Sequence, residues 1–144
     1  MTESRDYYPR DLLRYPTYAL GKLHKAMHVE LGTPLREHWV LTYLSEFSEI
    51  SQQEMADALG IDRSEVVRLI DSLEKSGLVT RTRDADDRRK YRLAITNSGR
   101  ALRDETNARI SAATDNLLHR LTPAERETLH RLSLKALGYD LDEL

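Results

Sequence analysis

Apolar residues recur every three or four positions along most of this 144-residue chain, which is the period of helices with one buried face. The pattern predicts six helices, at about residues 16–31, 34–47, 52–59, 62–76, 96–121 and 122–137. Glycines follow four of them, and glycine readily takes the left-handed conformation in which helices end. Several apolar side chains of the second and sixth helices are expected to face inward: Trp39, Val40, Tyr43 and Leu44, and Leu129, Leu132, Ala136 and Leu137.

Between the fourth and fifth helices the period changes to two, which is typical of strands. Residues 78–81 and 91–95 are predicted to form a two-stranded hairpin, or wing, with a charged turn between them. An isolated hairpin is only marginally stable in water, so the wing must pack against helices. Residues 81–92 hold six Arg or Lys side chains against three Asp, although the whole chain has a net charge of −2. Binding to a polyanion would therefore depend on this local patch.

Residues 52–73 have the spacing of a helix-turn-helix. Ala56, Gly60 and Val66 occupy the fifth, ninth and fifteenth places, where the motif needs a small residue, a turn and an apolar contact. Ser51 with Glu54, and Asp62 with Glu65, are spaced as capping boxes at the starts of the two helices. A helical hairpin within a small core, with its arginines as solvated charges, is the alternative interpretation.

Composition narrows the class of protein. The chain contains no cysteine, which excludes disulfides and thiolate redox sensing. It has no apolar run of transmembrane length and no signal-peptide pattern, so a soluble, cytoplasmic, single-domain protein is expected. It also lacks a nucleophile elbow, a phosphate loop and a carboxylate pair in an apolar setting, so neither catalysis nor a cofactor is expected. His24 and His28 could share a metal, but without an evident third ligand two exposed histidines are the favoured interpretation.

The sequence resembles the MarR family of winged helix-turn-helix transcriptional regulators. The likeness rests on residues 59–81, LGIDRSEVVRLIDSLEKSGLVTR, and 84–100, DADDRRKYRLAITNSGR. It departs from the family pattern at Ala94-Ile95, where leucine is commoner. The resemblance implies an entwined homodimer, with dimerisation helices at about 10–31 and 97–139 and a DNA-binding lobe at about 34–96. The alternative is that the terminal helices fold back on the core of their own chain.

In a winged helix-turn-helix, the second helix of the pair enters the major groove of DNA. Four residues would then reach base edges or nearby phosphates: Arg63, Ser64, Val67 and Arg68. Phosphate contacts are expected at the start of the preceding helix, from Ser51, Gln52 and Gln53. By resemblance, Arg89 would enter the minor groove, with Arg88 beside it and Asp87 orienting its guanidinium; Arg83 and Lys90 are further candidates. A solvated surface charge is the alternative for each arginine and for Lys90.

The resemblance also implies control of transcription at a pseudo-palindromic operator, by repression or by activation, with repression expected. Members of the family often release DNA when a small aromatic or phenolic acid binds beside the DNA-binding lobe. The expected effector residues lie on the first two helices: Arg14, Tyr15, Tyr18, His38, Trp39 and Tyr43. Trp39 and Tyr43 are alternatively core residues. A winged helix that binds another protein instead of DNA is the rival function.

Overall fold

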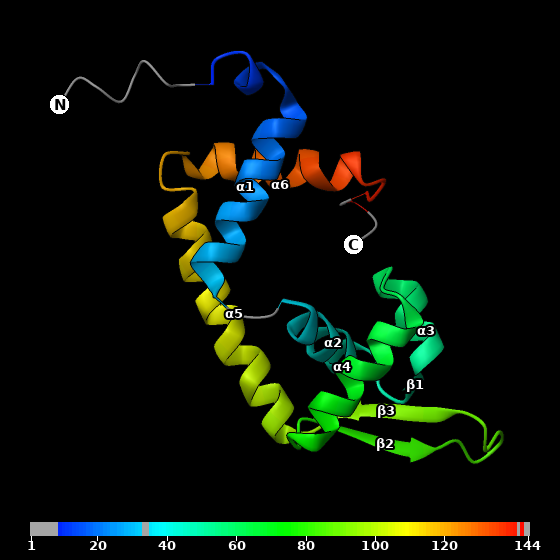
Figure 1. The fold of residues 1–144 in the computed structure, drawn as a ribbon. Coiled ribbons are helices and arrows are strands. Elements are labelled where there is room, and N and C mark those ends of the chain that lie inside the picture. Colours follow the sequence, from blue (N-terminus) through cyan, green and yellow to red (C-terminus); the bar gives the residue numbers. More distant parts are fainter. Residues whose placement is uncertain (1–8, 33–34, 141, 143–144) are drawn as a thin grey trace. The chain divides into compact units, whose positions relative to one another are not determined.

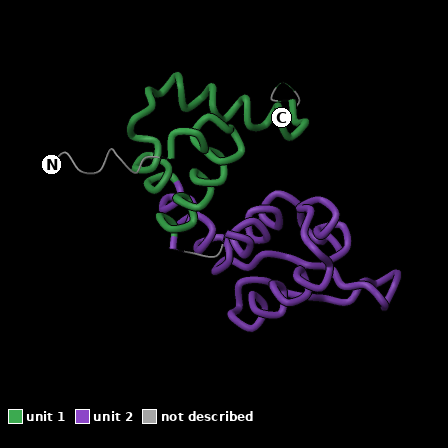
Figure 2. The backbone as a smooth tube through the Cα atoms, turned by 45° about the horizontal axis from the view of Figure 1, so that its top comes forward, with its two compact units in different colours: residues 1–31, 111–144 green, residues 32–110 purple. Residues whose placement is uncertain are grey.

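The structure is a computed structural model that describes residues 9–32, 35–140 and 142. The chain forms two compact units, shown in different colours in Figure 2. The first unit comprises residues 1–31 and 111–144, and the second comprises residues 32–110. Helix α5 (Asn97–Leu117) contributes to both units. The predicted start of the second helix at Pro34 lies outside the described residues.

The second unit contains four helical segments and a small antiparallel sheet (Figure 1). Its elements are α2 (Leu35–Glu46), β1 (Ile50–Ser51), α3 (Gln52–Leu59), α4 (Arg63–Lys75), β2 (Val79–Arg83), β3 (Tyr91–Ile95) and the first part of α5. Strands β2 and β3 and their connection, residues 79–95, form the wing. The mainly α fold with six helices and a β wing agrees with the prediction.

The sheet has a third strand that the sequence pattern did not indicate. Its order is β1-β3-β2, with Ile50 opposite Leu93 and Val79 opposite Ile95. Strand β1 was expected to be a connection, because two residues are too few to show an alternating pattern. It becomes a strand because the outer edge of β3 supplies backbone partners, and this pairing joins the wing to the start of α3.

One hydrophobic core holds the second unit together. Its side chains come from α2, from α3, α4 and the turn between them, and from the sheet: Val40, Leu41, Leu44, Met55, Ala56, Ile61, Val66, Ile70, Leu73, Val79 and Leu93. Trp39 was predicted to face inward, but the structure corrects this, since its side chain is 44% exposed. Trp39 is two residues from Leu41, hence about 200° away around the helix. The buried face of α2 is centred on Leu41 and Leu44.

Two helix starts have full capping boxes, and a third has a single cap. Full capping boxes form at Ser51 with Glu54 and at Thr122 with Glu125. At α4, Asp62 accepts a hydrogen bond from the backbone nitrogen of Ser64, whereas the Glu65 carboxylate forms an ion pair with Arg36 of α2. The predicted acidic capping box is therefore replaced by an Asp62 cap and a bridge between α2 and α4.

The first unit contains the 3-10 turn η1 (Leu12–Arg14), α1 (Pro16–Leu31), the end of α5 and α6 (Pro123–Ala136). Polar contacts join these elements: Asn116 donates to Glu30, and Arg126 forms an ion pair with Asp115. Among the described residues of this unit, Leu31 is the one buried hydrophobic side chain. Leu132 and Ala136 of α6, and Leu137 just after it, were predicted to face inward, which is wrong for the single chain, since all three are exposed.

Candidate nucleic-acid interface

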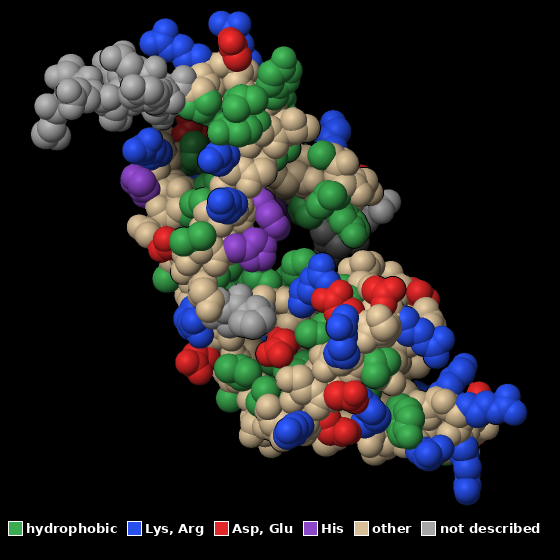
Figure 3. Space-filling model, viewed as in Figure 1, with side chains coloured by type: hydrophobic (Ala, Val, Ile, Leu, Met, Phe, Trp, Pro, Cys, Tyr) green, Lys and Arg blue, Asp and Glu red, His purple; other side chains and the backbone are tan. Residues whose placement is uncertain are grey.

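A groove runs between the start of the helix-turn-helix and the wing. It encloses about 370 Å³ and is lined by Ser51, Gln52, Gln53, Glu54, Arg63, Arg89, Lys90 and Tyr91. These residues come from the first turn of α3, the first turn of α4 and the wing. Six of them had been singled out from the sequence as DNA contacts or candidates, although they are spread over about 40 positions. Figure 3 shows Lys and Arg side chains gathered at the wing end of this unit.

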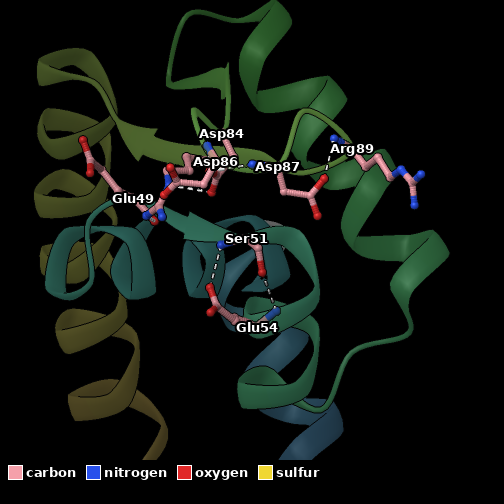
Figure 4. A network of polar contacts seen from close by, with 8 residues as sticks. Glu49, Ser51, Glu54, Asp84, Asp86, Asp87 and Arg89 are labelled. Atoms are coloured by element: carbon pink, nitrogen blue, oxygen red, sulfur yellow. Dashed lines mark hydrogen bonds and ion pairs between the residues drawn. The ribbon is translucent and has the colours of Figure 1, made fainter.

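The first turn of α3 is fixed by a reciprocal pair of hydrogen bonds (Figure 4). The backbone nitrogen of Ser51 donates to Glu54 Oε2 at 2.8 Å, and the backbone nitrogen of Glu54 donates to Ser51 Oγ at 3.1 Å. The bond from the Ser51 backbone nitrogen is the largest influence that lowers the pKa of the Glu54 carboxyl, and the Ser51 hydroxyl is the next. Next to them, Gln53 donates to Asp57. The buried amide nitrogen of Gln52 has no hydrogen-bond partner among the described residues.

Helix α4 presents three polar candidates to solvent. Arg63, Ser64 and Arg68 are exposed, whereas Val67 is half-buried. Ser64 donates its hydroxyl hydrogen to Asp62, and its backbone nitrogen donates to the same carboxylate at 2.8 Å. The side-chain bond from Ser64 is the main cause of a lowered pKa at Asp62. Ser64 can therefore offer a ligand its lone pairs more readily than its hydrogen.

The turn of the wing is organised around Asp84 (Figure 4). Its Oδ1 accepts hydrogen bonds from the backbone nitrogens of Asp86 at 2.8 Å and Asp87 at 3.3 Å. Its Oδ2 accepts a bond from Arg92 Nε at 2.9 Å. The backbone bond from Asp86 is the largest of the effects that lower the pKa of Asp84. The carboxylate therefore stays ionised and closes the turn at neutral pH.

In this structure Asp87 bonds the backbone of Arg89 and not its guanidinium, so its role beside Arg89 at DNA stays a prediction. Its Oδ1 accepts a bond from the backbone nitrogen of Arg89 at 3.0 Å, and the Arg89 side chain extends away from that carboxylate (Figure 4). A carboxylate this close to the backbone satisfies the turn first, because aspartate readily bonds the nitrogen two residues on. The Arg89 side chain is left exposed in the groove.

Arg83 is exposed on the wing, and its side chain bonds to the wing itself. Its Nη1 donates to the carbonyl of Arg88 at 2.7 Å, and its guanidinium carbon lies 5.2 Å from the centre of the Tyr91 ring. Arg81 lies 5.4 Å from the same ring and forms an ion pair with Asp71 of α4. Tyr91 is thus flanked by two cations. The pair of Arg81 with Asp71 joins the wing to α4.

Similarity to known proteins identifies the family of the chain. The model of the MarR family matches residues 31–90. The chain is also similar to a MarR-family transcriptional regulator from Rhodococcus sp. RHA1, with 32% identity over 87% of this chain and 88% of that one and a TM-score of 0.66. The chain belongs to the MarR family.

Two further MarR-like structures have the same fold. The transcriptional repressor CouR, bound to a 23-mer DNA duplex, is 28% identical over 90% of this chain and 96% of that one, with a TM-score of 0.79. The PcaV transcriptional regulator from Streptomyces coelicolor, in complex with its natural ligand, is 22% identical over 88% and 94%, with a TM-score of 0.78. The present protein is a MarR-family DNA-binding transcriptional regulator, which confirms the prediction of a regulator rather than an enzyme.

In this MarR-family chain, the expected effector residues fall into two sets. Arg14, Tyr15 and Tyr18 belong to the first unit, and His38, Trp39 and Tyr43 belong to the second. Arg14 and Tyr15 are exposed, with Arg14 Nη1 3.9 Å from the Asp11 carboxylate, whereas Tyr18 is half-buried beneath the Lys22 ammonium. His38 is buried, Trp39 is exposed, and the half-buried Tyr43 packs against Phe47 and the core.

Sequence reasoning missed three residues that hold the MarR-like wing in place: Asp84 and Arg92 within it, and Glu49 just before β1. Arg92 Nη1 donates to the carbonyl of Glu49 at 2.8 Å, and Glu49 has a left-handed backbone with φ of 57°. An Asp-x-Asp sequence at a turn is a known signal for side-chain bonds to the backbone, so the role of Asp84 could have been predicted from the sequence. The contact between Arg92 and Glu49 has no local signal.

Among the described residues, no helix is long and apolar enough to cross a membrane.

Proposed function

We propose that this MarR-family protein is a repressor that binds a pseudo-palindromic operator as a homodimer and is released by a small aromatic or phenolic acid. The observation that carries the proposal is the groove, which brings together Arg63, Arg89 and the first turn of α3. Two guanidinium groups and the backbone N–H groups of a helix start form a surface suited to phosphate.

The position of each DNA-contact candidate indicates which part of the DNA it would contact. Gln52 and Gln53 begin α3, so their backbone N–H groups and Ser51 beside them suit a DNA phosphate. Arg68 and Val67 lie further along α4, with Arg63 and Ser64 in its first turn, where a helix in the major groove meets base edges. The exposed cations of the wing turn are Arg88, Arg89 and Lys90. That the related CouR is a repressor bound to duplex DNA supports this assignment.

The homodimer is supported by the composition of the first unit. Leu31 is its one buried hydrophobic residue among those described, whereas eight large apolar side chains are exposed there: Leu12, Leu13, Tyr15, Leu20, Val29, Leu132, Leu137 and Tyr139. Helices that expose this much apolar surface require a partner surface. A second copy of the chain supplies an identical set, which is the requirement for a two-fold symmetric interface. The helices at about 10–31 and 97–139 are the proposed dimerisation elements.

The proposed effector residues offer a positive charge and aromatic rings. The exposed guanidinium of Arg14 suits a carboxylate, and the exposed rings of Tyr15 and Trp39 suit an aromatic group. The related PcaV was determined with its natural ligand, so ligand binding has a precedent on this fold. Tyr18, His38 and Tyr43 complete the proposed set. His38 and Tyr43 have less surface to offer, because both pack in the second unit.

The test of DNA binding is a titration of the duplex upstream of the protein's own gene, repeated at several salt concentrations. We expect log affinity to fall linearly with log salt, because each neutralised phosphate releases counterions. An affinity that does not change with salt concentration would favour the rival function of a protein-interaction module. So would a lack of binding both to this duplex and to a random-sequence library. Sedimentation at micromolar concentration should give about twice the mass of the chain, 16.6 kDa, and a monomer would exclude the dimeric operator.

Effector release is tested by adding a panel of aromatic acids to the complex with DNA. An active acid should lose at least about tenfold in potency when Arg14→Gln removes the guanidinium. Arg10→Gln is the matched control, since Arg10 carries the same charge four residues earlier and is also exposed. If both variants respond like the wild type, Arg14 does not hold the acid.

A further inference from the structure

The exposed side chains of His24 and His28 meet on one face of α1. Their Nε2 atoms lie 3.0 Å apart, and the two rings are edge to face with centroids separated by 4.4 Å. The residues are four positions apart, so both lie on the same face of the helix, one turn from each other. Neither ring has another hydrogen bond or ion pair among the described residues. Neither belongs to the proposed DNA contacts or to the proposed effector set.

The spacing of the two nitrogens suits a single metal ion. With metal–nitrogen bonds of about 2.0–2.1 Å, a separation of 3.0 Å corresponds to a nitrogen–metal–nitrogen angle of about 95°. That is the angle between adjacent positions of a square-planar or octahedral complex, the geometry of Cu²⁺ and Ni²⁺ with nitrogen ligands. A tetrahedral ion such as Zn²⁺ would need the nitrogens about 3.3–3.4 Å apart at the same bond lengths.

The same two rings can also pair without metal. One Nε2 then carries a hydrogen and donates it to the lone pair of the other. Metal binding requires both hydrogens on Nδ1, so that both Nε2 lone pairs face the ion. Both states keep the two rings close together, and they differ in tautomer and in the directions of the two Nε2 lone pairs. A helix that already holds the rings together has less conformational entropy to lose on binding the ion.

We propose that His24 and His28 bind one Cu²⁺ ion per chain through their Nε2 atoms, with water in the remaining positions. The described residues contain no group of three or more His, Cys, Asp or Glu side chains that could enclose an ion. The site is therefore open, and its affinity is that of a two-imidazole chelate. Because the ion joins two turns of α1, it stabilises that helix when bound. Cu²⁺ is preferred over Ni²⁺ and Zn²⁺, in the usual order of divalent affinities.

The experiment is a Cu²⁺ titration of the full chain, followed by electron paramagnetic resonance and by thermal melting. We expect one equivalent to bind per chain with a nitrogen-coordinated spectrum and to raise the melting temperature. Either His24→Ala or His28→Ala should weaken this binding at least about tenfold and remove the rise. His130→Ala is the control, because His130 is an exposed histidine on α6; it should leave both readouts unchanged.

A second control keeps the number of histidines constant. Lys25→His combined with His28→Ala places the two histidines at adjacent positions, about 100° apart around the helix, so they should not chelate. Circular dichroism without metal checks that each variant keeps its helix. Wild-type affinity in His24→Ala, restored binding in the double variant, or an equal loss in His130→Ala would each overturn the proposal.

Discussion

The guanidinium of Arg92 and the carboxylate of Asp84 face each other across the wing, with 2.9 Å between Nε and Oδ2. Arg92 also donates to the carbonyl of Glu49, immediately before β1. Asp84 in turn accepts the backbone nitrogens of Asp86 and Asp87. This pair therefore connects the turn that carries Arg89 with the strand that leads into α3.

We expect Asp84→Asn to weaken DNA binding by several-fold, because the turn that holds Arg89 loses its ionic contact with Arg92. Asp86→Asn is the control, since it removes the same charge two residues away, and Asp86 enters the turn through its backbone nitrogen. Removing a negative charge should by itself help DNA binding. If Asp84→Asn lowers the affinity and Asp86→Asn does not, the loss is due to a displaced wing turn and not to the change in charge. Equal affinities for the two variants would show that the pair does not position the wing.

Replacing Arg89 by Ala should reduce the salt dependence of DNA binding. The slope of log affinity against log salt should fall by about one for each wing, hence by about two in a dimer. The free energy of unfolding should change by no more than about 0.5 kcal/mol, since the side chain is exposed. Arg100→Ala is the control, because it removes an exposed positive charge outside the groove. Identical slopes for Arg89→Ala and the wild type would show that the wing does not contact DNA.

Arg68→Ala should cost about 1–3 kcal/mol of discrimination at one base position in each half-site. Arg68→Lys keeps the charge but loses the bidentate geometry, so it should recover affinity without recovering discrimination. Binding selections on a randomised operator measure both quantities. If Arg68→Ala lowers the affinity for operator and random DNA equally, Arg68 contacts phosphate.

Gly99→Ala should destabilise the second unit by about 1–3 kcal/mol, as overpacking of a tight site does. A Cβ atom there would lie 2.7 Å from Ile95 Cγ1, and nearer still to the carbonyl oxygen of Leu78. Gly21→Ala in α1 is the opposite case, because its Cβ would meet nothing within 4 Å. That change should stabilise the helix by about 0.5–1 kcal/mol. Urea unfolding of the two variants should therefore move in opposite directions.

His38 should make stability depend on pH between neutral and mildly acidic conditions. Burial, its largest influence, lowers the pKa of His38 below the ordinary value of 6.5. As pH falls through 6.5 the unfolded chain therefore binds this proton before the folded chain does, and folding stability decreases. The loss ends below the folded-state pKa, where both states are protonated. His38→Gln should flatten this part of the stability curve, whereas His130→Gln should not.

The sequence by itself determined the parts of this protein that depend on local pattern. Helical periodicity located all six helices, and the capping residues Ser51 and Asp62 marked two of their starts. The basic stretch at residues 81–92 marked the wing despite the negative net charge. These signals are reliable because each is completed within a few residues. The roles of the DNA-contact residues, in contrast, stay predictions.

Only the tertiary structure decided which of the candidate side chains are free to meet a ligand. Arg83 and Arg89 look alike in sequence, but Arg83 donates to a carbonyl of its own wing, whereas Arg89 lines the groove. Strand β1 exists because β3 pairs with it, and Arg92 reaches Glu49 across 43 positions of the chain. Contacts of this kind depend on the packing of elements that are distant in sequence, and no local pattern encodes their geometry.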